Sequence, residues 1–286
     1  MSAVSNNQVQ RISNRTTLSA VLIVKNEENM IEDCLQSLHG WVDEIVVLDS
    51  GSTDRTMELA HKWGAKVHVR EDWQGHGIQR QRAQQLATGD YILAIDADER
   101  VSPELRESIE AVLANPNDQK VYEVVRNNWF LGTCLDRHGW HHETLVRLYA
   151  RKKYAYHSSR VHESVDTQGA ARVRLHGPLL HDTCHNYEYF LEKHVAYAHT
   201  WARERAEQGR KPPLLSAIIH AGWNFFRLYF LQGGFLDGRY GFLFAVHASH
   251  YVFNKYAALW YYGCSQSVAN SDPKKEPLLA KRRHAA

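Results

Sequence analysis

The segment YILAIDADER, residues 91–100, joins an apolar run to a dense group of acids, and it decides the fold. Its first five residues suit the middle of a buried strand, whereas Asp96, Asp98 and Glu99 place three carboxylates within four positions. A strand buried on both faces is typical of helix-covered parallel sheets, in which ligands bind beyond the carboxyl ends of the strands. The segment therefore predicts a strand whose end forms part of a ligand site.

Three further apolar runs of strand length precede this segment, and helical stretches separate them. The runs are LSAVLIV at residues 18–24, EIVVLD at 44–49 and AKVHV at 65–69. Strands that alternate with helices indicate an α/β fold with a mostly parallel, Rossmann-like sheet flanked by helices. Polar, acid-rich segments follow three of the four strands and should meet along one edge of the sheet; they are residues 25–28, 49–54 and 96–99.

Length, charge and cysteine spacing narrow the class of protein. The chain has 286 residues, of which 44% are hydrophobic, so it can bury a sizeable core. Its formal net charge of +2 argues against bulk binding of nucleic acid. The four cysteines lie far apart and form no CxxC pair, which indicates reduced thiols rather than a disulfide framework or a zinc site.

Asp96 and Asp98 are the candidates for a metal site. Side chains alternate along an extended chain, so both carboxylates would point the same way with Ala97 between them. Like charges that face one spot repel each other unless a proton or a cation sits there, and Mg²⁺ or Mn²⁺ prefers such oxygen ligands. The alternative is that these acids cap the following helix, SPELRESIEAVL, although Ser102 and Glu104 already suit its start.

The sequence contains neither of the two common phosphate-binding loops. GxGxxG is missing after the first strand, and GxxxxGK[ST] occurs nowhere. A nucleotide bound at this edge would need its charge balanced by a metal and by basic side chains. Arg80 and Arg82, in the helical run before the fourth strand, could supply the basic groups, or they could form a solvated helix face.

The order and spacing of four segments resemble the inverting family-2 glycosyltransferases, which have a GT-A fold and use nucleotide-sugar donors. The segments are SAVLIVKNEE, EIVVLDSGSTDRT, the arginine-bearing helix and ATGDYILAIDADE, and the resemblance continues more weakly to about residue 200. Within the family, the chain looks most like the bacterial lipopolysaccharide core enzymes that add glucose to a heptose. The resemblance implies metal-dependent transfer of a hexose, glucose from UDP-glucose, onto a heptose of the inner core.

The resemblance also implies which residues bind the donor. Asn26 and Glu27 would line the nucleoside pocket, Asp49 would hydrogen-bond the uracil, and Arg80 would contact the uridine diphosphate. Asp96 would lie near the donor. The ordinary alternatives are that Asn26 caps a helix and that Asp49 is a turn residue. One departure is visible, because many relatives have a second aspartate at position 50, where this chain has serine.

The metal and the base complete the implied site. Asp98 would hold Mg²⁺ or Mn²⁺, and His181, in LLHDT, would supply a further contact to the metal or the diphosphate. An inverting displacement needs a base for the acceptor hydroxyl but no separate general acid when a metal stabilises the departing diphosphate. Glu163, in RVHESV, is the expected base, and Glu143 and Asp182 are the alternatives.

The last third of the chain differs in composition from the rest of the sequence. Two apolar stretches between residues 210 and 265 carry scattered charges and histidines, and their lengths are near the lower limit for a membrane span. They predict helices that lie in a membrane interface, although a buried helical subdomain or an oligomer contact would produce a similar pattern. The expected location is the cytoplasmic face of the bacterial inner membrane, with lipid A-heptose core as the acceptor.

Five segments follow from these patterns, and two other functions fit them. The segments are a flexible tail (1–17), a nucleotide-sugar-binding half (18–125), an acceptor-binding and catalytic half (126–209), the apolar helical region (210–265) and a basic flexible tail (266–286). The acceptor could instead be a polyprenyl phosphate. The chain could also be a non-enzymatic membrane-bound relative, although the joint presence of Asp96, Asp98, Arg80 and Glu163 argues against lost turnover.

Overall fold

The computed structural model describes residues 15–135, 143–158, 164–184 and 186–271, and it divides the chain into two compact units. We call them the strand unit and the helical unit. The strand unit comprises residues 1–128 and 142–182, and the helical unit comprises residues 129–141 and 183–286.

Four parallel strands form the first part of the sheet in the strand unit. β1 (Leu18–Val24) pairs in parallel with β2 (Glu44–Asp49) and with β4 (Tyr91–Ala94), and β3 (Lys66–Val69) pairs with β2. The three inner strands are buried almost throughout, because helices and neighbouring strands cover them. The connecting helices are α2 (Ile31–Leu38), α3 (Thr56–Lys62) and α4 (His76–Leu86). This half of the sheet is the parallel α/β arrangement that the sequence predicts.

The remaining strands make the sheet mixed rather than mostly parallel. β8 (Glu143–Ala150) runs antiparallel to β4 and to β6 (Lys120–Phe130), and β11 (Ala171–Cys184) runs antiparallel to β5 (Glu99–Val101). The full order is β3-β2-β1-β4-β8-β6-β11-β5. A parallel pair needs a long crossover, usually a helix, and the described part of the strand unit contains no helix after α5 (Pro103–Ala114). The described pairs of β8 with β4 and β6, and of β11 with β5, are accordingly antiparallel.

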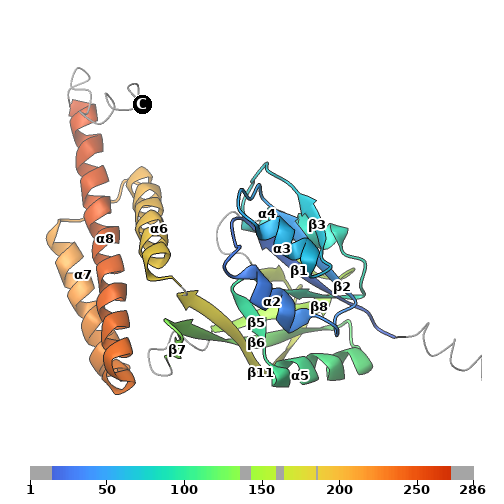
Figure 1. Ribbon diagram of the computed structural model, residues 1–286. Coiled ribbons are helices and arrows are strands. Elements are labelled where there is room, and N and C mark those ends of the chain that lie inside the picture. The colour runs from blue at the N-terminus through green and yellow to red at the C-terminus, as the bar shows by residue number, and fades with distance from the viewer. Residues whose placement is uncertain (1–14, 136–142, 159–163, 185, 272–286) are drawn as a thin grey trace, which may run out of the picture. The chain divides into compact units, whose positions relative to one another are not determined.

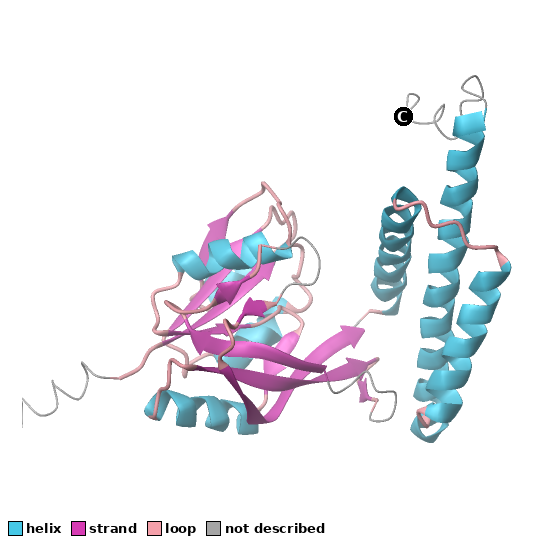
Figure 2. Ribbon diagram, turned by 180° about the vertical axis from the view of Figure 1, so that it is seen from behind, coloured by secondary structure: helices cyan, strands magenta, loops and turns pink. Residues whose placement is uncertain are grey.

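Helix α5 runs along the opposite side of the strand unit from α3 and α4 (Figures 1 and 2). It begins at Ser102, whose hydroxyl accepts a hydrogen bond from the backbone N–H of Leu105 at 3.2 Å, so it needs no acidic cap from the preceding turn. Strand β11 passes directly over this start at Gly177, where φ is +89° and a Cβ atom would lie 2.3 Å from the Leu105 nitrogen. Only glycine fits such an approach.

In its described residues, the helical unit contains three longer helices and two short helical turns. α7 (Leu215–Phe226) continues into a π-helical turn, η1 (Arg227–Leu231), and a 3₁₀ turn, η2 (Gly234–Asp237), leads into α8 (Gly238–Ser271). α6 (Tyr187–Glu207) also packs against α8 and belongs to the helical unit. Alanines and aromatic rings fill the interfaces: Ala202, Ala206, Ala258 and Leu259 in one cluster, and Phe130, Phe190 and Phe244 in another.

The helical unit leaves many large apolar side chains exposed. Along α7 and η1 these are Leu215, Ile218, Ile219, Trp223, Phe226, Phe230 and Leu231, and η2 and α8 add Phe235, Leu236, Phe242 and Val246. We call these eleven side chains the apolar surface of the helical unit. Over residues 15–135, 143–158, 164–184 and 186–271, no helix is both long and apolar enough to cross a membrane. Small strands complete the chain: β7 (Thr133–Cys134), β9 (Ala155–Tyr156) and β10 (Val165–Asp166).

Candidate active site

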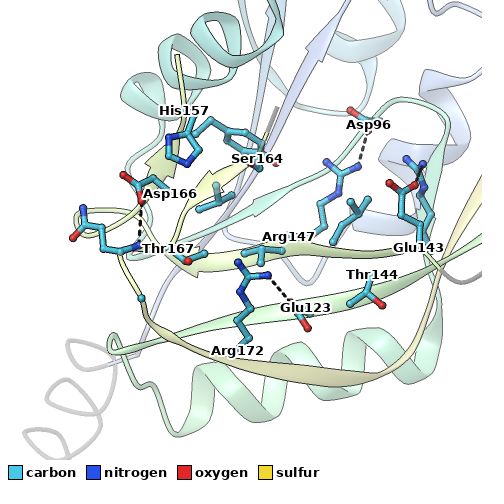
Figure 3. Close-up of a pocket in the computed structure, with 17 residues that line it drawn as sticks. Asp96, Glu123, Glu143, Thr144, Arg147, His157, Ser164, Asp166, Thr167 and Arg172 are labelled. Carbon is cyan, nitrogen blue, oxygen red and sulfur yellow. Dashed lines mark hydrogen bonds and ion pairs between the residues drawn. The ribbon is translucent and has the colours of Figure 1, made fainter. Parts of the chain in front are cut away.

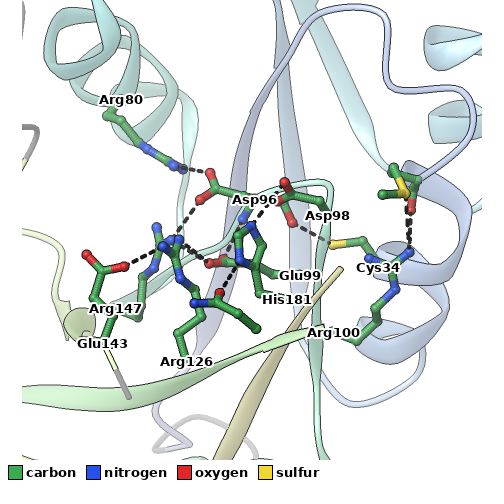
Figure 4. Close-up of polar contacts among 12 residues, drawn as sticks. Cys34, Arg80, Asp96, Asp98, Glu99, Arg100, Arg126, Glu143, Arg147 and His181 are labelled. Carbon is green, nitrogen blue, oxygen red and sulfur yellow. Dashed lines mark hydrogen bonds and ion pairs between the residues drawn. The ribbon is translucent and has the colours of Figure 1, made fainter. Parts of the chain in front are cut away.

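The acidic segment after β4 turns instead of continuing as an extended strand. β4 ends at Ala94, residues 97–98 form a turn, and β5 begins at Glu99. The Asp96 carbonyl accepts a hydrogen bond from the Glu99 N–H at 3.0 Å, and the Asp96 N–H donates to the Glu99 carboxylate at 2.9 Å. The expectation that Asp96 and Asp98 alternate along a strand and face one spot is therefore wrong. The turn leads the two carboxylates to different partners (Figure 4).

Two arginines hold the Asp96 carboxylate. Arg80, on α4, is almost fully buried and forms an ion pair with Asp96, while Arg147, on β8, donates to its other oxygen at 2.7 Å. Burial would raise the pKa of the Asp96 carboxyl, but the attraction of Arg80 and Arg147 outweighs burial and holds the pKa well below its usual range. Asp96 is therefore ionised, and the positive charge that it needs comes from the protein.

Glu99 is the third acid of the segment, and it is completely buried. It accepts a hydrogen bond from Arg147 at 2.7 Å and lies 3.5 Å from Arg126, on β6. Burial raises the pKa of the Glu99 carboxyl, and the attraction of Arg147 offsets only part of that increase. Arg147 thus joins Asp96 to Glu99 from one position, and it is the central cation of the cluster.

Asp98 and His181 form a separate pair beside this cluster. The Nε2 atom of His181, near the end of β11, lies 3.2 Å from the Asp98 carboxylate, and its Nδ1 atom lies 2.5 Å from the Asn128 side-chain oxygen. In the tautomer whose proton is on Nδ1, that N–H donates to the Asn128 side-chain oxygen, and the Nε2 lone pair faces the Asp98 carboxylate. Two such acceptors face each other favourably when a cation lies between them.

Asp98 and His181 together suit a divalent cation that has open coordination positions. A carboxylate oxygen and an imidazole nitrogen are both ligands of Mn²⁺, and Mg²⁺ is commonly held by one or two carboxylates together with water and phosphate oxygens. Within the described residues, no three side chains of His, Cys, Asp or Glu are arranged to hold a metal. A cation held by Asp98 and His181 alone would keep further coordination positions for other oxygen ligands.

The loops after β1 and β2 are tied together at the residues expected to hold the nucleoside. Asn26 has a φ of +56°, which is uncommon for residues other than glycine, and its side-chain oxygen accepts from the Thr53 N–H at 2.8 Å. Glu27 donates its backbone N–H to the Thr56 hydroxyl at 2.7 Å. Asp49 is fully buried and accepts from the N–H groups of Gly51 and Ser52 at 2.8 and 2.7 Å. The Asp49 carboxylate thus shapes the second loop, and its contact with uracil stays a prediction.

A cavity of about 730 Å³ extends from Asp96 into the antiparallel half of the strand unit (Figure 3). Charged side chains line it in pairs. Arg126 forms an ion pair with Glu143, Arg172 lies 3.4 Å from Glu123, and Arg147 reaches Asp96 at one end. The other lining residues include Tyr156, His157, Ser164, Asp166, Thr167 and Gln168. Such a polar, half-open cavity has the size of a small-molecule site.

The candidate bases are placed differently. Glu143 lines the cavity and is about half exposed. Asp182 donates its backbone N–H to the Asp98 carbonyl at 2.9 Å, which fixes the chain next to His181. Glu163, the expected base, lies outside the described residues.

Three contributors to the site are missing from the sequence-based predictions. Arg147, Arg126 and Asn128 each contact a predicted residue, and each lies within an alternating strand segment. The signal for Arg147 is an arginine at an inward position of RLYA, where β8 is otherwise buried. A charged residue at such a position indicates a buried acidic partner, because an unpaired buried charge is very costly.

Comparisons with known proteins show which proteins this chain is similar to. Residues 19–176 match the family model described as glycosyl transferase family 2. The chain is 32% identical over 241 residues to the lipopolysaccharide core biosynthesis glycosyltransferase LpsC of Rhizobium meliloti, covering 82% of this chain and 89% of the relative. It is 31% identical over 236 residues to an uncharacterized glycosyltransferase of Rickettsia bellii, covering 79% of this chain and 80% of the relative.

Solved structures show a partial likeness. The glucosyl-3-phosphoglycerate synthase of Mycobacterium tuberculosis, in complex with Mn²⁺, UDP and its glucosylated product, matches with 32% identity and a TM-score of 0.33. The match covers 42% of this chain and 46% of the synthase, so it spans less than half of either chain.

Proposed function

Because the chain belongs to glycosyl transferase family 2, we propose that it transfers a hexose, with inversion, from a UDP-sugar to a lipopolysaccharide core acceptor. The observation that carries this proposal is the separation of charges in YILAIDADER. Arginines neutralise Asp96 and Glu99, while Asp98 faces His181 in an arrangement that favours a divalent cation. A site of this kind suits a donor that leaves as a diphosphate.

Each side chain has a defined task in the proposed reaction. Asp98 and His181 hold the cation, which, when bound, supplies positive charge against the departing diphosphate. Arg147 fixes Asp96 and Glu99, so the turn that carries Asp98 keeps its shape as the donor arrives. The acceptor hydroxyl loses its proton to a carboxylate as it attacks, and a positioned base is typically worth 10²–10⁴-fold in rate. Glu163 is the proposed base, and Glu143 is the alternative that lines the cavity.

The acceptor proposal rests on the cavity and on one relative. LpsC of Rhizobium meliloti is named for lipopolysaccharide core biosynthesis, and it matches most of this chain. The cavity of about 730 Å³ begins at Asp96 and is lined by paired arginines and carboxylates, which hydrogen-bond well to sugar hydroxyls. A heptose of the inner core, with glucose as the transferred sugar, is the combination that we propose.

The helical unit would bring the enzyme to this acceptor. A lipopolysaccharide precursor is an amphiphile held in a membrane, and the apolar surface of the helical unit gathers eleven exposed large apolar side chains, as sites of protein or membrane contact do. Its tryptophan and phenylalanines are residues that suit a membrane interface. We propose that this surface lies in the cytoplasmic leaflet of the inner membrane.

The decisive experiment is donor binding with and without metal. In wild-type protein, UDP-glucose should raise the melting temperature more in Mn²⁺ than in EDTA, because a ligand that binds the folded state stabilises it by mass action. Asp98→Asn should lose this metal-dependent increase, and it should also lose glucose release from UDP-glucose. The matched control is Asp33→Asn, which removes an exposed aspartate paired with Arg100. Metal-dependent binding that survives in Asp98→Asn, or is lost equally in Asp33→Asn, would refute the assignment.

A further inference from the structure

The helical unit contains a cavity that no step of the proposed transfer uses. It has a volume of about 300 Å³ and lies among α6, α7, η1 and α8. Its polar lining consists of His194 from α6, Asn224 from α7, Arg227 from η1, Gln232 and, from α8, His247 and Tyr251. The remaining lining residues, Leu228, Phe244, Ala248 and Val252, are apolar. The cavity therefore combines an apolar wall with a group of hydrogen-bonding side chains.

Arg227 is the one charged residue among the ten that line this cavity. Its guanidinium donates to the Asn224 side-chain oxygen at 3.0 Å, which fixes it over the cavity and employs one of its five N–H donors. His194 and His247 lie in contact, with 2.7 Å between Nδ1 and Nε2. Burial lowers the pKa of each histidine to about 4, so both rings are neutral at physiological pH. The lining contains a cation and no carboxylate, and this composition suits an anion.

The position of Arg227 points to the source of that anion. Trp223 precedes it by four positions at the end of α7, and Phe230 and Leu231 follow it within the same π-helical turn. All three are about half exposed or more. An exposed arginine among exposed apolar side chains is the arrangement that meets lipid phosphates when an apolar helix face enters the headgroup region.

We propose that this cavity binds the phosphate of an anionic membrane lipid, with Arg227 as the ion-pairing residue and Asn224 and Gln232 as hydrogen-bonding partners. The inference rests on the membrane attachment proposed above. The volume of the cavity is at the lower end of the range for ligand sites, so the cavity fits a lipid headgroup and not a whole lipid. The acyl chains would remain in the leaflet beside the apolar surface.

The test measures full-chain binding to two kinds of vesicle, phosphatidylcholine alone and phosphatidylcholine mixed with phosphatidylglycerol. Arg227→Gln removes the charge but retains a group that can bond Asn224, and Ala248→Leu fills the cavity without changing charge. The control is Arg239→Gln, which removes an exposed arginine of α8 that does not line the cavity. Arg239→Gln should weaken binding to the mixed vesicles no more than about fivefold, the worth of one cation near an anionic surface. Arg227→Gln should weaken binding to the mixed vesicles by roughly tenfold or more, because this substitution also removes charge-assisted hydrogen bonds.

A second arm uses soluble ligands in titrations of the same variants. Dihexanoyl phosphatidylglycerol should bind saturably to wild type and to Arg239→Gln, and Arg227→Gln and Ala248→Leu should each lose that binding.

If inorganic phosphate binds as well as the short-chain lipid, the site is a free-phosphate site and the lipid proposal fails. Equal losses for Arg227→Gln and Arg239→Gln on vesicles, with no saturable binding of the soluble lipid, overturn the site while membrane attachment stands. Saturable, Arg227-dependent binding of the soluble lipid without vesicle binding supports the site and refutes the attachment. No binding in either arm overturns the site, and a stable dimer seen in that case would assign the apolar surface to a second copy.

Discussion

Replacing Arg147 by methionine should destabilise the strand unit by about 3–5 kcal/mol, the usual cost of leaving a buried charge without its partner. The side chain of Arg147 is only 5% exposed, and it donates to Asp96 and Glu99 at 2.7 Å each. Methionine fills a similar volume, so little of the cost comes from a cavity. Asp96 retains Arg80, but Glu99 is fully buried and keeps only the more distant Arg126 among the arginines described here.

The loss of stability in Arg147→Met should depend on pH, and the charges of the cluster determine the direction of this dependence. Without Arg147, the pKa of the already raised Glu99 carboxyl increases further, because the attraction that offsets burial is removed. The folded variant then binds a proton that the unfolded chain releases above its ordinary glutamate pKa of 4.5. Stability that depends on such a raised pKa is present at acidic pH and falls as pH rises towards the folded-state value. The destabilisation should therefore be smaller at pH 5 than at pH 8.

Urea unfolding of wild type and variant, followed by circular dichroism at both pH values, measures this effect. Arg106→Met is the control, because it removes an arginine from an exposed i,i+4 pair with Glu110 and should cost less than about 1 kcal/mol. Adding Glu99→Gln to Arg147→Met should recover part of the stability at pH 8, since the buried charge is then gone. The reasoning is refuted if Arg147→Met costs no more than Arg106→Met, or if its cost is the same at both pH values.

Two further predictions concern carboxylates outside this cluster. Glu44 is buried, which would raise the pKa of its carboxyl, but hydrogen bonds from Lys66, Ser19 and Thr88 lower it from 4.5 to about 2. Its contribution of about 3 kcal/mol is present above pH 4.5 and is lost as pH falls towards 2, so the stability gap between wild type and Glu44→Gln should narrow over that range in urea unfolding. Glu163→Gln should keep the affinity for UDP-glucose and lose roughly 10²–10⁴-fold in kcat, whereas a larger kcat loss in Glu143→Gln at unchanged donor binding would transfer the role of base.

The parallel half of the sheet could be predicted because its signals are local. β1, β2 and β4 are short apolar runs bounded by polar loops, and β1 and β2 are each followed along the chain by a helix. The antiparallel half depends on pairs that are far apart in sequence, such as β4 with β8 and β5 with β11. Alternation along those segments indicates a strand but carries no information about its partner or direction, so a mostly parallel sheet was the wrong extension of a correct beginning.

The candidate site was likewise predictable from the sequence only in part. Asp96 and Asp98 stand out because three acids within four positions need compensation, and from sequence alone a metal is the expected source of the compensating charge. The compensation for Asp96 instead comes from Arg80 and Arg147, and Arg147 lies 51 positions away. The turn at residues 97–98 could not be predicted either, because its main support is two hydrogen bonds between Asp96 and Glu99. The Glu99 N–H donates to the Asp96 carbonyl, and the Asp96 N–H donates to the Glu99 carboxylate.

The arginine partners explain why the acidic segment can exist before any cation arrives. If Asp96, Asp98 and Glu99 all depended on a bound metal, the turn would be under strong repulsion in its absence. Arg80 and Arg147 remove that repulsion for Asp96 and Glu99, and the same contacts hold the turn in place. In the proposed reaction, a cation held by Asp98 and His181 would then act on the donor diphosphate without also having to compensate Asp96 and Glu99. A site that is assembled in advance spends less binding energy on ordering its own side chains, and it can direct more of that energy to the departing group.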